Sequence, residues 1–167
     1  MRSKLPTRTA SQRLGFALAT WFGVGNLPAA PGTFGSLAAL PLAWLLANYG
    51  GVPALAVAGV AVFAVGWWAS NVYVDTTGID DPGPVVIDEV AGQWLTLLPA
   101  APGVWWHWLA GFVLFRMFDI VKPWPVGWAD KRIKGGFGVM FDDILAAIYA
   151  FAALTGLILI ERSINFS

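Results

Sequence analysis

Acidic residues occur in this 167-residue chain as adjacent pairs, although only 12% of its residues are charged. The pairs are Asp80-Asp81, in a loop, and Asp88-Glu89 and Asp142-Asp143, with Asp119 between the last two in the sequence. Carboxylates that gather in one place repel one another unless a cation lies among them. Oxygen ligands without His or Cys favour Mg²⁺, which keeps some waters and shares its other positions with a phosphate. We therefore predict a magnesium site in which Asp88, Glu89, Asp142 and Asp143 are the ligands and Asp119 is a further catalytic residue.

Helix capping is the alternative explanation for either pair, because acids near a helix N-terminus complement the helix dipole and satisfy free amide groups. Asp142-Asp143 follow the stretch GGFGVM, whose glycines we expect to form a flexible turn and to let the backbone approach closely. Asp130 is either a member of the site or one half of an ion pair in a loop.

Basic residues and a second glycine-rich stretch are candidates for binding a phosphate. Arg116 and Asp119 are three residues apart, so they share a helix face and form either a simple ion pair or part of the site. Lys122 and Lys134 adjoin turns, and the KPWP sequence should end the helix that carries Arg116. In GVGNLPAAPGTFGS (residues 23–36), successive amides near Gly32, followed by a helix that Thr33 or Ser36 caps, would form an anion-binding nest.

The composition places the chain in a membrane. Hydrophobic residues make up 57% of the chain and the formal net charge is zero, whereas soluble domains are about 45–50% apolar and about 25% charged. A nucleic-acid partner is not expected, because the chain has no overall basic field. Cysteine is absent, which excludes disulfides and thiolate chemistry. The length favours one membrane-embedded domain over residues 1–167.

Long apolar segments predict an all-α, polytopic integral membrane protein with about four to five membrane helices, one or two of them short or partly inserted. Residues 52–74 are long enough to span a bilayer, 141–161 are a second strong candidate, and 37–50 are shorter and kinked at Pro41. PAAPG at 99–103 divides 90–115 into a short helix and a longer one. We expect no cleavage of the basic and apolar N-terminus as a signal peptide, since the glycine-rich stretch follows it.

Nine of the ten basic residues gather in three stretches, 1–13, 116–122 and 131–134, with only Arg162 elsewhere, and the turns at 49–53 and 99–104 carry no charge. By the positive-inside rule, the basic N-terminus (1–13) and the loops 75–89 and 116–141 are cytoplasmic. Every acid except Glu161 then lies at the cytoplasmic face. His107 lies among Trp105, Trp106 and Trp108 on the uncharged side, where we expect interfacial residues and not a catalytic base.

Four stretches together closely resemble the phosphatidylglycerophosphatase A family: APGTFGS, IDEVAGQW, FRMFDIVKPWPVGWADKRIKGG and GVMFDDILA. The resemblance runs from about residue 12 to about residue 156 in the order of the family, and the segments around 45–80 match only in hydrophobicity. It implies a Mg²⁺-dependent lipid phosphatase of the bacterial cytoplasmic membrane. Such an enzyme hydrolyses phosphatidylglycerol phosphate to phosphatidylglycerol and inorganic phosphate, with its active site on the cytoplasmic face.

The resemblance gives the candidate residues their roles. One or two magnesium ions would lie between the carboxylates and the phosphate, and Arg116, Lys122 and Lys134 would balance the phosphate oxygens. The amides of Gly32 and Thr33, with Ser36, would complete the phosphate cradle. We expect direct attack by a water that the metal activates. A phosphoaspartate intermediate stays open, although the DxDxT signature of aspartate-nucleophile phosphatases is absent.

Other readings are a phosphatase of another membrane lipid phosphate, such as a polyprenyl phosphate, a small cation transporter, or a non-catalytic membrane scaffold. A transporter predicts acids near the middle of the bilayer and charge on both sides. The sequence leaves open the number of metal ions, the identity of the base and the oligomeric state.

Overall fold

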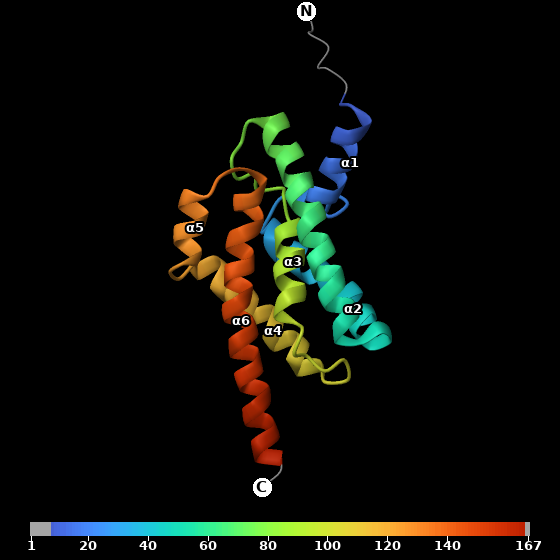
Figure 1. Cartoon of the computed structure of the whole chain (residues 1–167), viewed down its shortest axis with the longest axis vertical. Helices are drawn as coiled ribbons and strands as arrows, with labels where there is room; N and C mark the ends of the chain where they lie inside the picture. Colours follow the sequence, from blue (N-terminus) through green and yellow to red (C-terminus); the bar gives the residue numbers. More distant parts are fainter. Residues whose placement is uncertain (1–7, 166–167) are drawn as a thin grey trace, which may run out of the picture.

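The computed structural model describes residues 8–165, and every regular element in this range is a helix (Figure 1). The elements are α1 (Ala10–Ala19), a short 3₁₀ helix η1 (Val24–Asn26), α2 (Pro31–Thr77), α3 (Ile87–Thr96), α4 (Trp105–Val121), α5 (Val126–Arg132) and α6 (Gly135–Asn165). The all-α prediction is therefore confirmed for this part of the chain. Residues 1–7 of the predicted basic N-terminus lie outside the described residues.

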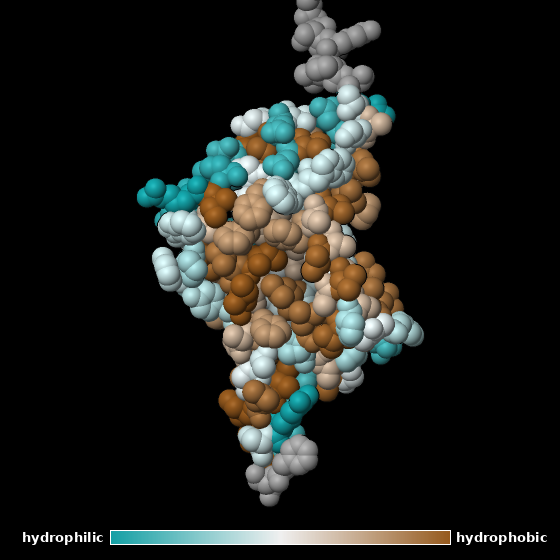
Figure 2. Space-filling view, in the orientation of Figure 1, coloured by the Kyte–Doolittle hydropathy of each residue, from teal (hydrophilic) through white to brown (hydrophobic). Residues whose placement is uncertain are grey.

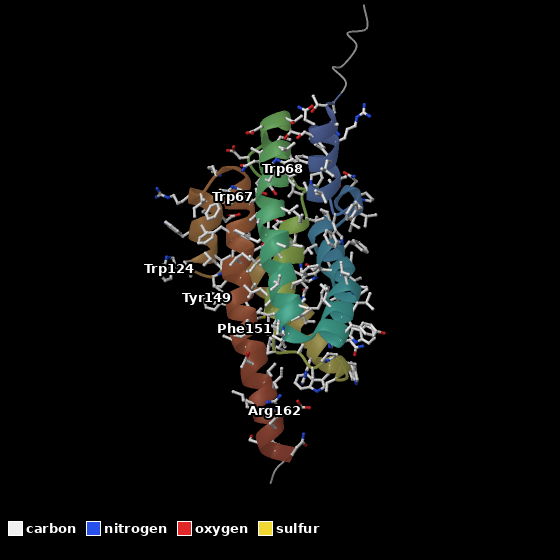
Figure 3. All side chains as sticks on the ribbon, turned by 45° about the vertical axis from the view of Figure 1, so that its right-hand side comes forward. Trp67, Trp68, Trp124, Tyr149, Phe151 and Arg162 are labelled. Carbon is white, nitrogen blue, oxygen red and sulfur yellow. The ribbon has the colours of Figure 1, made fainter. Side chains whose placement is uncertain are left out.

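Helix α2 consists of two arms that lie side by side (Figures 1 and 3). The break is at Gly51, whose φ of 68° and ψ of −174° are non-helical and suit a residue without a Cβ. We call residues 31–50 the first arm and 52–77 the second arm. The uncharged turn predicted at 49–53 is thus confirmed. Helix α2 begins at Pro31, upstream of the predicted start at 37, and the first arm continues as a helix through Pro41.

Helix α3 is the short central element that the PAAPG break predicts. It has ten residues, which is about half the length needed to cross a bilayer. Most of its side chains are buried, and it lies between α2 and α6 (Figure 1). Because α3 carries Asp88 and Glu89, these acids enter the interior of the helix bundle.

Small residues allow the helices to pack closely around α3. Ala39 and Ala43 of the first arm and Ala146, Ala147 and Ala150 of α6 are fully buried. Such residues are common where membrane helices pack, because they let the backbones approach. On α3, a Cβ at Gly92 would lie 2.6 Å from the Phe115 ring and 3.1 Å from the Asp143 carbonyl oxygen. This close packing fixes α3 against both α4 and α6.

Two of the described helices, α2 and α6, are long and apolar enough to cross a membrane. The predicted four to five membrane helices are therefore not confirmed in number: α3 and α4 have only 10 and 17 residues, and α2 contains two arms that join at Gly51. Figure 2 shows a broad hydrophobic band over the middle of the molecule and hydrophilic residues at the end that holds α1. Arg162 lies towards the opposite end (Figure 3).

Candidate metal and phosphate site

A polar cavity of about 350 Å³ lies among the beginnings of α2 and α3, the end of α4 and the first half of α6. It brings together residues that are more than 100 positions apart in the sequence. Most of the predicted site residues line it, namely Gly32, Thr33, Asp88, Glu89, Arg116, Asp119, Lys122, Asp142 and Asp143. We call it the acidic pocket.

Three carboxylates in the acidic pocket form a compact group. Asp88, Glu89 and Asp143 each contribute one oxygen, and these oxygens all lie within 4.8 Å of one another. Asp88 Oδ1, Glu89 Oε2 and Asp143 Oδ2 are buried and have no hydrogen-bond partner. Buried charged oxygens without partners are costly. A divalent cation would remove this cost, and a set of oxygen ligands suits Mg²⁺, so these three residues fit the predicted metal.

Asp142, the fourth predicted ligand, is not part of this group and is held by a lysine. Lys122 Nζ donates to Asp142 Oδ2 at 2.8 Å and also to Asp130. Burial alone would lower the pKa of Lys122, but the hydrogen bonds to Asp130 and Asp142 outweigh it and raise this pKa above its usual value. Asp130 is therefore an ion-pair partner of Lys122, and only three of the four predicted ligands meet.

Helix capping is wrong for Asp142 and Asp143. Helix α6 begins at Gly135, so both aspartates lie beyond its first turn, and the GGFG stretch is helical and not a flexible turn. The predicted close approach does occur: a Cβ at Gly136 would lie 2.3 Å from the Asn71 backbone nitrogen, and the Gly136 N–H donates to Asn71 Oδ1 at 2.9 Å. Packing of α6 on α2 therefore starts the helix early and places the aspartates in the interior.

Asp88 and Glu89 lie in the first turn of α3, where they complement the helix dipole, although the N-cap residue makes no side-chain hydrogen bond. Burial, followed by the charge of Glu89, raises the pKa of Asp88 well above its usual value. Burial also raises the pKa of Glu89. Both carboxyl groups thus resist ionisation unless a cation is present.

The N-terminus of α2 lies at the acidic pocket through Gly32 and Thr33. N–H groups in the first turn of a helix have no partner within the helix, and they attract anions. The predicted cap is wrong: the N-cap is Ala30, with a left-handed φ of 46° and no side-chain hydrogen bond, and Thr33 and Ser36 lie inside the helix.

Gly32 also provides space for two site residues. A Cβ at Gly32 would lie 2.1 Å from Glu89 Oε1 and 3.1 Å from each terminal nitrogen of Arg116. Arg116 Nη1 lies 2.6 Å from Asp119 Oδ2 and 3.7 Å from Glu89 Oε1, so the predicted Arg116–Asp119 pair is confirmed. Gly32 thus allows Glu89 and Arg116 to meet against the start of α2.

Two predicted phosphate-binding residues do not line the acidic pocket. Ser36 is fully buried, and its hydroxyl donates to the Gly32 carbonyl at 3.0 Å. Lys134 lines a small cavity with Asp80 and Asp130, which adjoins the acidic pocket at Asp142. Ser36 lies behind the acidic pocket, where its hydroxyl accepts a hydrogen bond from Arg116 Nη1 at 3.5 Å.

Two further polar residues, one in the acidic pocket and one inside α3, were not among the predicted site residues. Asp81, from the loop between α2 and α3, lines the acidic pocket. Gln93 is completely buried, and neither its amide nitrogen nor its amide oxygen has a partner. Gln93 is four residues after Glu89 on α3, so the two share a helix face. The four-residue spacing of Glu89 and Gln93 in IDEVAGQW is the sequence feature that could have predicted their shared helix face.

His107 lies at the far end of α4 and has a structural role there. Its Nδ1 accepts a hydrogen bond from the Ala101 N–H at 3.0 Å, so its Nε2 carries the proton and donates to Glu161 Oε2 at 3.1 Å. The prediction that His107 is not a catalytic base agrees with its distant position, outside the acidic pocket. It is buried; of its neighbours, Trp105 is 74% exposed and Trp108 is buried.

Comparison with known proteins matches residues 17–158 to the family model described as Phosphatidylglycerophosphatase A. The chain is 39% identical over 138 residues to phosphatidylglycerophosphatase A of Escherichia coli K12, covering 82% of this chain and 79% of the relative. It is 42% identical over 134 residues to the protein of the same name from Haemophilus influenzae Rd, covering 80% and 82%.

A third relative, from Bacteroides thetaiotaomicron, is 43% identical over 142 residues, covering 80% of this chain and 87% of the relative. Its name gives phosphatidylinositol-3-phosphatase as a provisional activity. No solved structure matches the chain.

Proposed function

We propose that this chain, which belongs to the phosphatidylglycerophosphatase A family, hydrolyses phosphatidylglycerol phosphate to phosphatidylglycerol and inorganic phosphate with Mg²⁺ as cofactor. Membership of the family makes the chain a phosphoric monoester hydrolase. The observation that carries the proposal is the group of Asp88, Glu89 and Asp143, whose buried oxygens lack partners in a pocket that also holds Arg116.

Asp88, Glu89 and Asp143 would hold the magnesium ion. When bound, the ion supplies positive charge that polarises a phosphoryl oxygen and acidifies a water molecule. It also removes the repulsion among the three carboxylates, which burial makes costly. The protein itself contributes a fixed set of oxygens on two packed helices, α3 and α6, so that little rearrangement is needed on binding.

The phosphate is bound by groups on three sides of the acidic pocket. Arg116 and Lys122 supply positive charge from the end of α4, and the first-turn amides at Gly32 and Thr33 supply hydrogen-bond donors from α2. Both cations are already paired with carboxylates, Arg116 with Asp119 and Lys122 with Asp142. These pairs hold the cationic groups in place before the substrate arrives.

Hydrolysis forms a bond between a water oxygen and phosphorus and breaks the bond from phosphorus to the glycerol oxygen. The water loses a proton to a carboxylate of the pocket, and the glycerol oxygen gains one as it leaves. Asp119 and Asp142 are the candidates for the base, because they line the acidic pocket outside the three-carboxylate group.

A membrane setting is supported by the two long apolar helices and by the hydrophobic band in Figure 2. We place the acidic pocket at the cytoplasmic face of the bacterial inner membrane. The exposed Lys131 and Arg132 on α5 support this orientation through the positive-inside rule. The phosphate of a membrane lipid would then meet the acidic pocket at the headgroup level.

The test measures phosphate release by purified protein in detergent, with and without Mg²⁺, from phosphatidylglycerol phosphate and from phosphatidic acid. We expect Mg²⁺-dependent release that prefers the first substrate and falls at least about 100-fold in Asp143→Asn. Asp75→Asn is the matched control, because Asp75 is exposed and lies outside the acidic pocket. Folded wild-type protein that releases no phosphate with any metal would refute the proposal.

A phosphatase of another membrane lipid phosphate is the second candidate, and the provisional name of the Bacteroides relative favours it. The same assay with phosphatidylinositol 3-phosphate and a polyprenyl phosphate decides between the two. A higher kcat/KM for either of these than for phosphatidylglycerol phosphate would assign the chain to the second candidate. The cation transporter gains no support, because the described acids other than Glu161 do not extend to the far end of the bundle.

A further inference from the structure

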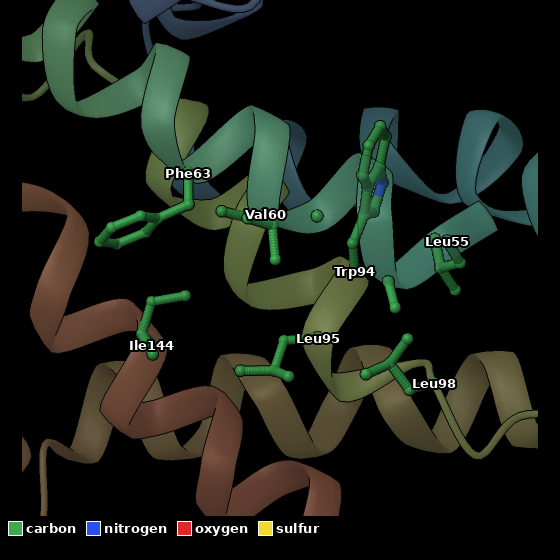
Figure 4. Close-up of a pocket in the computed structure, with 10 residues that line it drawn as sticks. Leu55, Val60, Phe63, Trp94, Leu95, Leu98 and Ile144 are labelled. Carbon is green, nitrogen blue, oxygen red and sulfur yellow. The ribbon is translucent and has the colours of Figure 1, made fainter. Parts of the chain in front are cut away.

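A second cavity, of about 310 Å³, lies on another side of α3 and is lined only by apolar residues (Figure 4). The second arm of α2, α3 and α6 form its walls, with Gly59, Val60, Phe63, Ala91, Leu95 and Ile144 among the lining residues. Trp94 also lines it, but its indole N–H is satisfied by the Ala39 carbonyl at 3.0 Å. The cavity thus offers no hydrogen-bond partner to a polar ligand.

The apolar cavity lies next to the metal-binding group along α3. Asp88, Ala91 and Leu95 are spaced i, i+3 and i+7, so they follow one face of the helix from the acidic pocket into the apolar cavity. At 1.5 Å per residue, Ala91 lies about 4.5 Å and Leu95 about 10 Å from Asp88 along the axis. On α6, Ile144 of the apolar cavity directly follows Asp143.

The apolar cavity opens towards the outside of the bundle between two candidate membrane-spanning helices. Val60 lines it and is 71% exposed, and it lies on α2, one of the two candidate membrane-spanning helices among the described residues. Water gains little in such a space, because a buried water needs two to four polar partners. A hydrocarbon chain from the surrounding membrane is the ligand best suited to contact these apolar walls.

We propose that the apolar cavity holds one acyl chain of the lipid whose phosphate is cleaved in the acidic pocket. This inference rests on the proposed function, and it adds a site for the lipid part of the substrate. The shared α3 face places the headgroup and the chain of one molecule at adjacent positions.

Gly59 allows the cavity to be filled without disturbing its surroundings. No heavy atom lies within 4 Å of a Cβ built on Gly59, and its φ is not in the left-handed region. Gly59→Leu therefore places a side chain in the cavity. Gly156→Leu is the matched control, because Gly156 on α6 is equally open but does not line the cavity. Ala56→Leu, from the same wall as Gly59, is a second filling variant.

The first experiment compares kcat/KM for phosphatidylglycerol phosphate with two sixteen-carbon chains and with two four-carbon chains. We expect Gly59→Leu to lower the value for the long-chain substrate at least about ten-fold and to leave the short-chain value unchanged, because the leucine side chain would overlap with a long acyl chain in the cavity. Gly156→Leu should change neither. An equal loss for both substrates, or no loss for either in both filling variants, would overturn the inference.

The second experiment does not depend on catalysis. A phosphatidylglycerol phosphate with a photoreactive diazirine at the end of one acyl chain is cross-linked to full-length protein in detergent, and the labelled peptides are identified. We expect labels near Val60 and Leu95 that disappear in Gly59→Leu and persist in Gly156→Leu.

The two experiments separate failure of the inference from failure of the proposed function. If the probe labels the cavity of a protein that releases no phosphate, the acyl-chain site is supported and the proposed phosphatase activity is refuted. Equal labelling by a phosphatidylcholine probe would show that any membrane lipid enters, and it would overturn the assignment to the substrate.

Discussion

Gly32→Ala tests the geometry of the acidic pocket with a single methyl group. The added Cβ would lie 2.1 Å from Glu89 Oε1, whereas real Cβ contacts essentially never fall below 3.0 Å. The Glu89 carboxylate must therefore move by about 1 Å, and Arg116, at 3.1 Å, must shift slightly as well. Glu89 is a flexible side chain and alanine is a good helix former, so we expect little change in stability.

The expected cost is in function, because displacement of the Glu89 carboxylate disturbs the group that it forms with Asp88 and Asp143. A misplacement of about 1 Å can lower catalysis about 100-fold, so we expect a loss of this size in kcat/KM together with weaker Mg²⁺ binding. The assay combines phosphate release, a Mg²⁺ titration and thermal unfolding in detergent. Gly156→Ala is the control, since a Cβ there meets no atom within 4 Å.

A second substitution tests whether the clash is the cause. Glu89→Asp withdraws the carboxylate by one methylene, so in the double variant the methyl of Gly32→Ala should cost much less than it does alone. Wild-type kcat/KM and Mg²⁺ affinity in Gly32→Ala would refute the reasoning, because Glu89 would then be able to leave its place without consequence. Additive losses in the double variant would refute the clash as the mechanism.

Three further predictions concern residues around the carboxylate group. Lys122→Met leaves Asp130 and Asp142 without the cation that they share, so we expect a loss of about 1–3 kcal/mol in the free energy of unfolding and a higher KM. Unchanged stability in chemical denaturation would contradict this prediction. Gln93→Met replaces a buried amide without partners by an apolar side chain of similar shape, so the free energy of unfolding should stay equal or rise by about 1 kcal/mol. We expect Mg²⁺-dependent activity to fall in this variant. Full activity would show that the amide has no role in the site. Burial raises the pKa of Asp88 and Glu89, so protons compete with Mg²⁺ for these carboxylates. As pH rises towards these raised pKa values, the metal-free protein should lose stability and Mg²⁺ should bind more tightly. Thermal unfolding across pH with and without Mg²⁺ measures both effects, and a pH-independent Mg²⁺ affinity would contradict the prediction.

Much of the fold follows from local features of the sequence. The main apolar helices and the breaks between them were predictable because apolar runs, the PAAPG interruption and the KPWP stop act over a few residues. The start of α6 was not, because it depends on Gly136 packing against Asn71, a residue far away in the sequence. Helix α5, which lies in the predicted loop 116–141, was not predicted either. The predicted number of membrane crossings is not confirmed, because hydropathy alone does not separate a spanning helix from a short buried one such as α3.

For the site, the sequence by itself determined the family, which the comparisons confirm, and its paired carboxylates and lack of cysteine predict a hard cation. Only the tertiary structure decided which carboxylates meet. Asp142 and Asp143 are neighbours in sequence, yet adjacent helical residues point about 100° apart, so one faces Lys122 and the other joins Asp88 and Glu89. Their partners come from other helices, and only the packing of those helices brings them within reach.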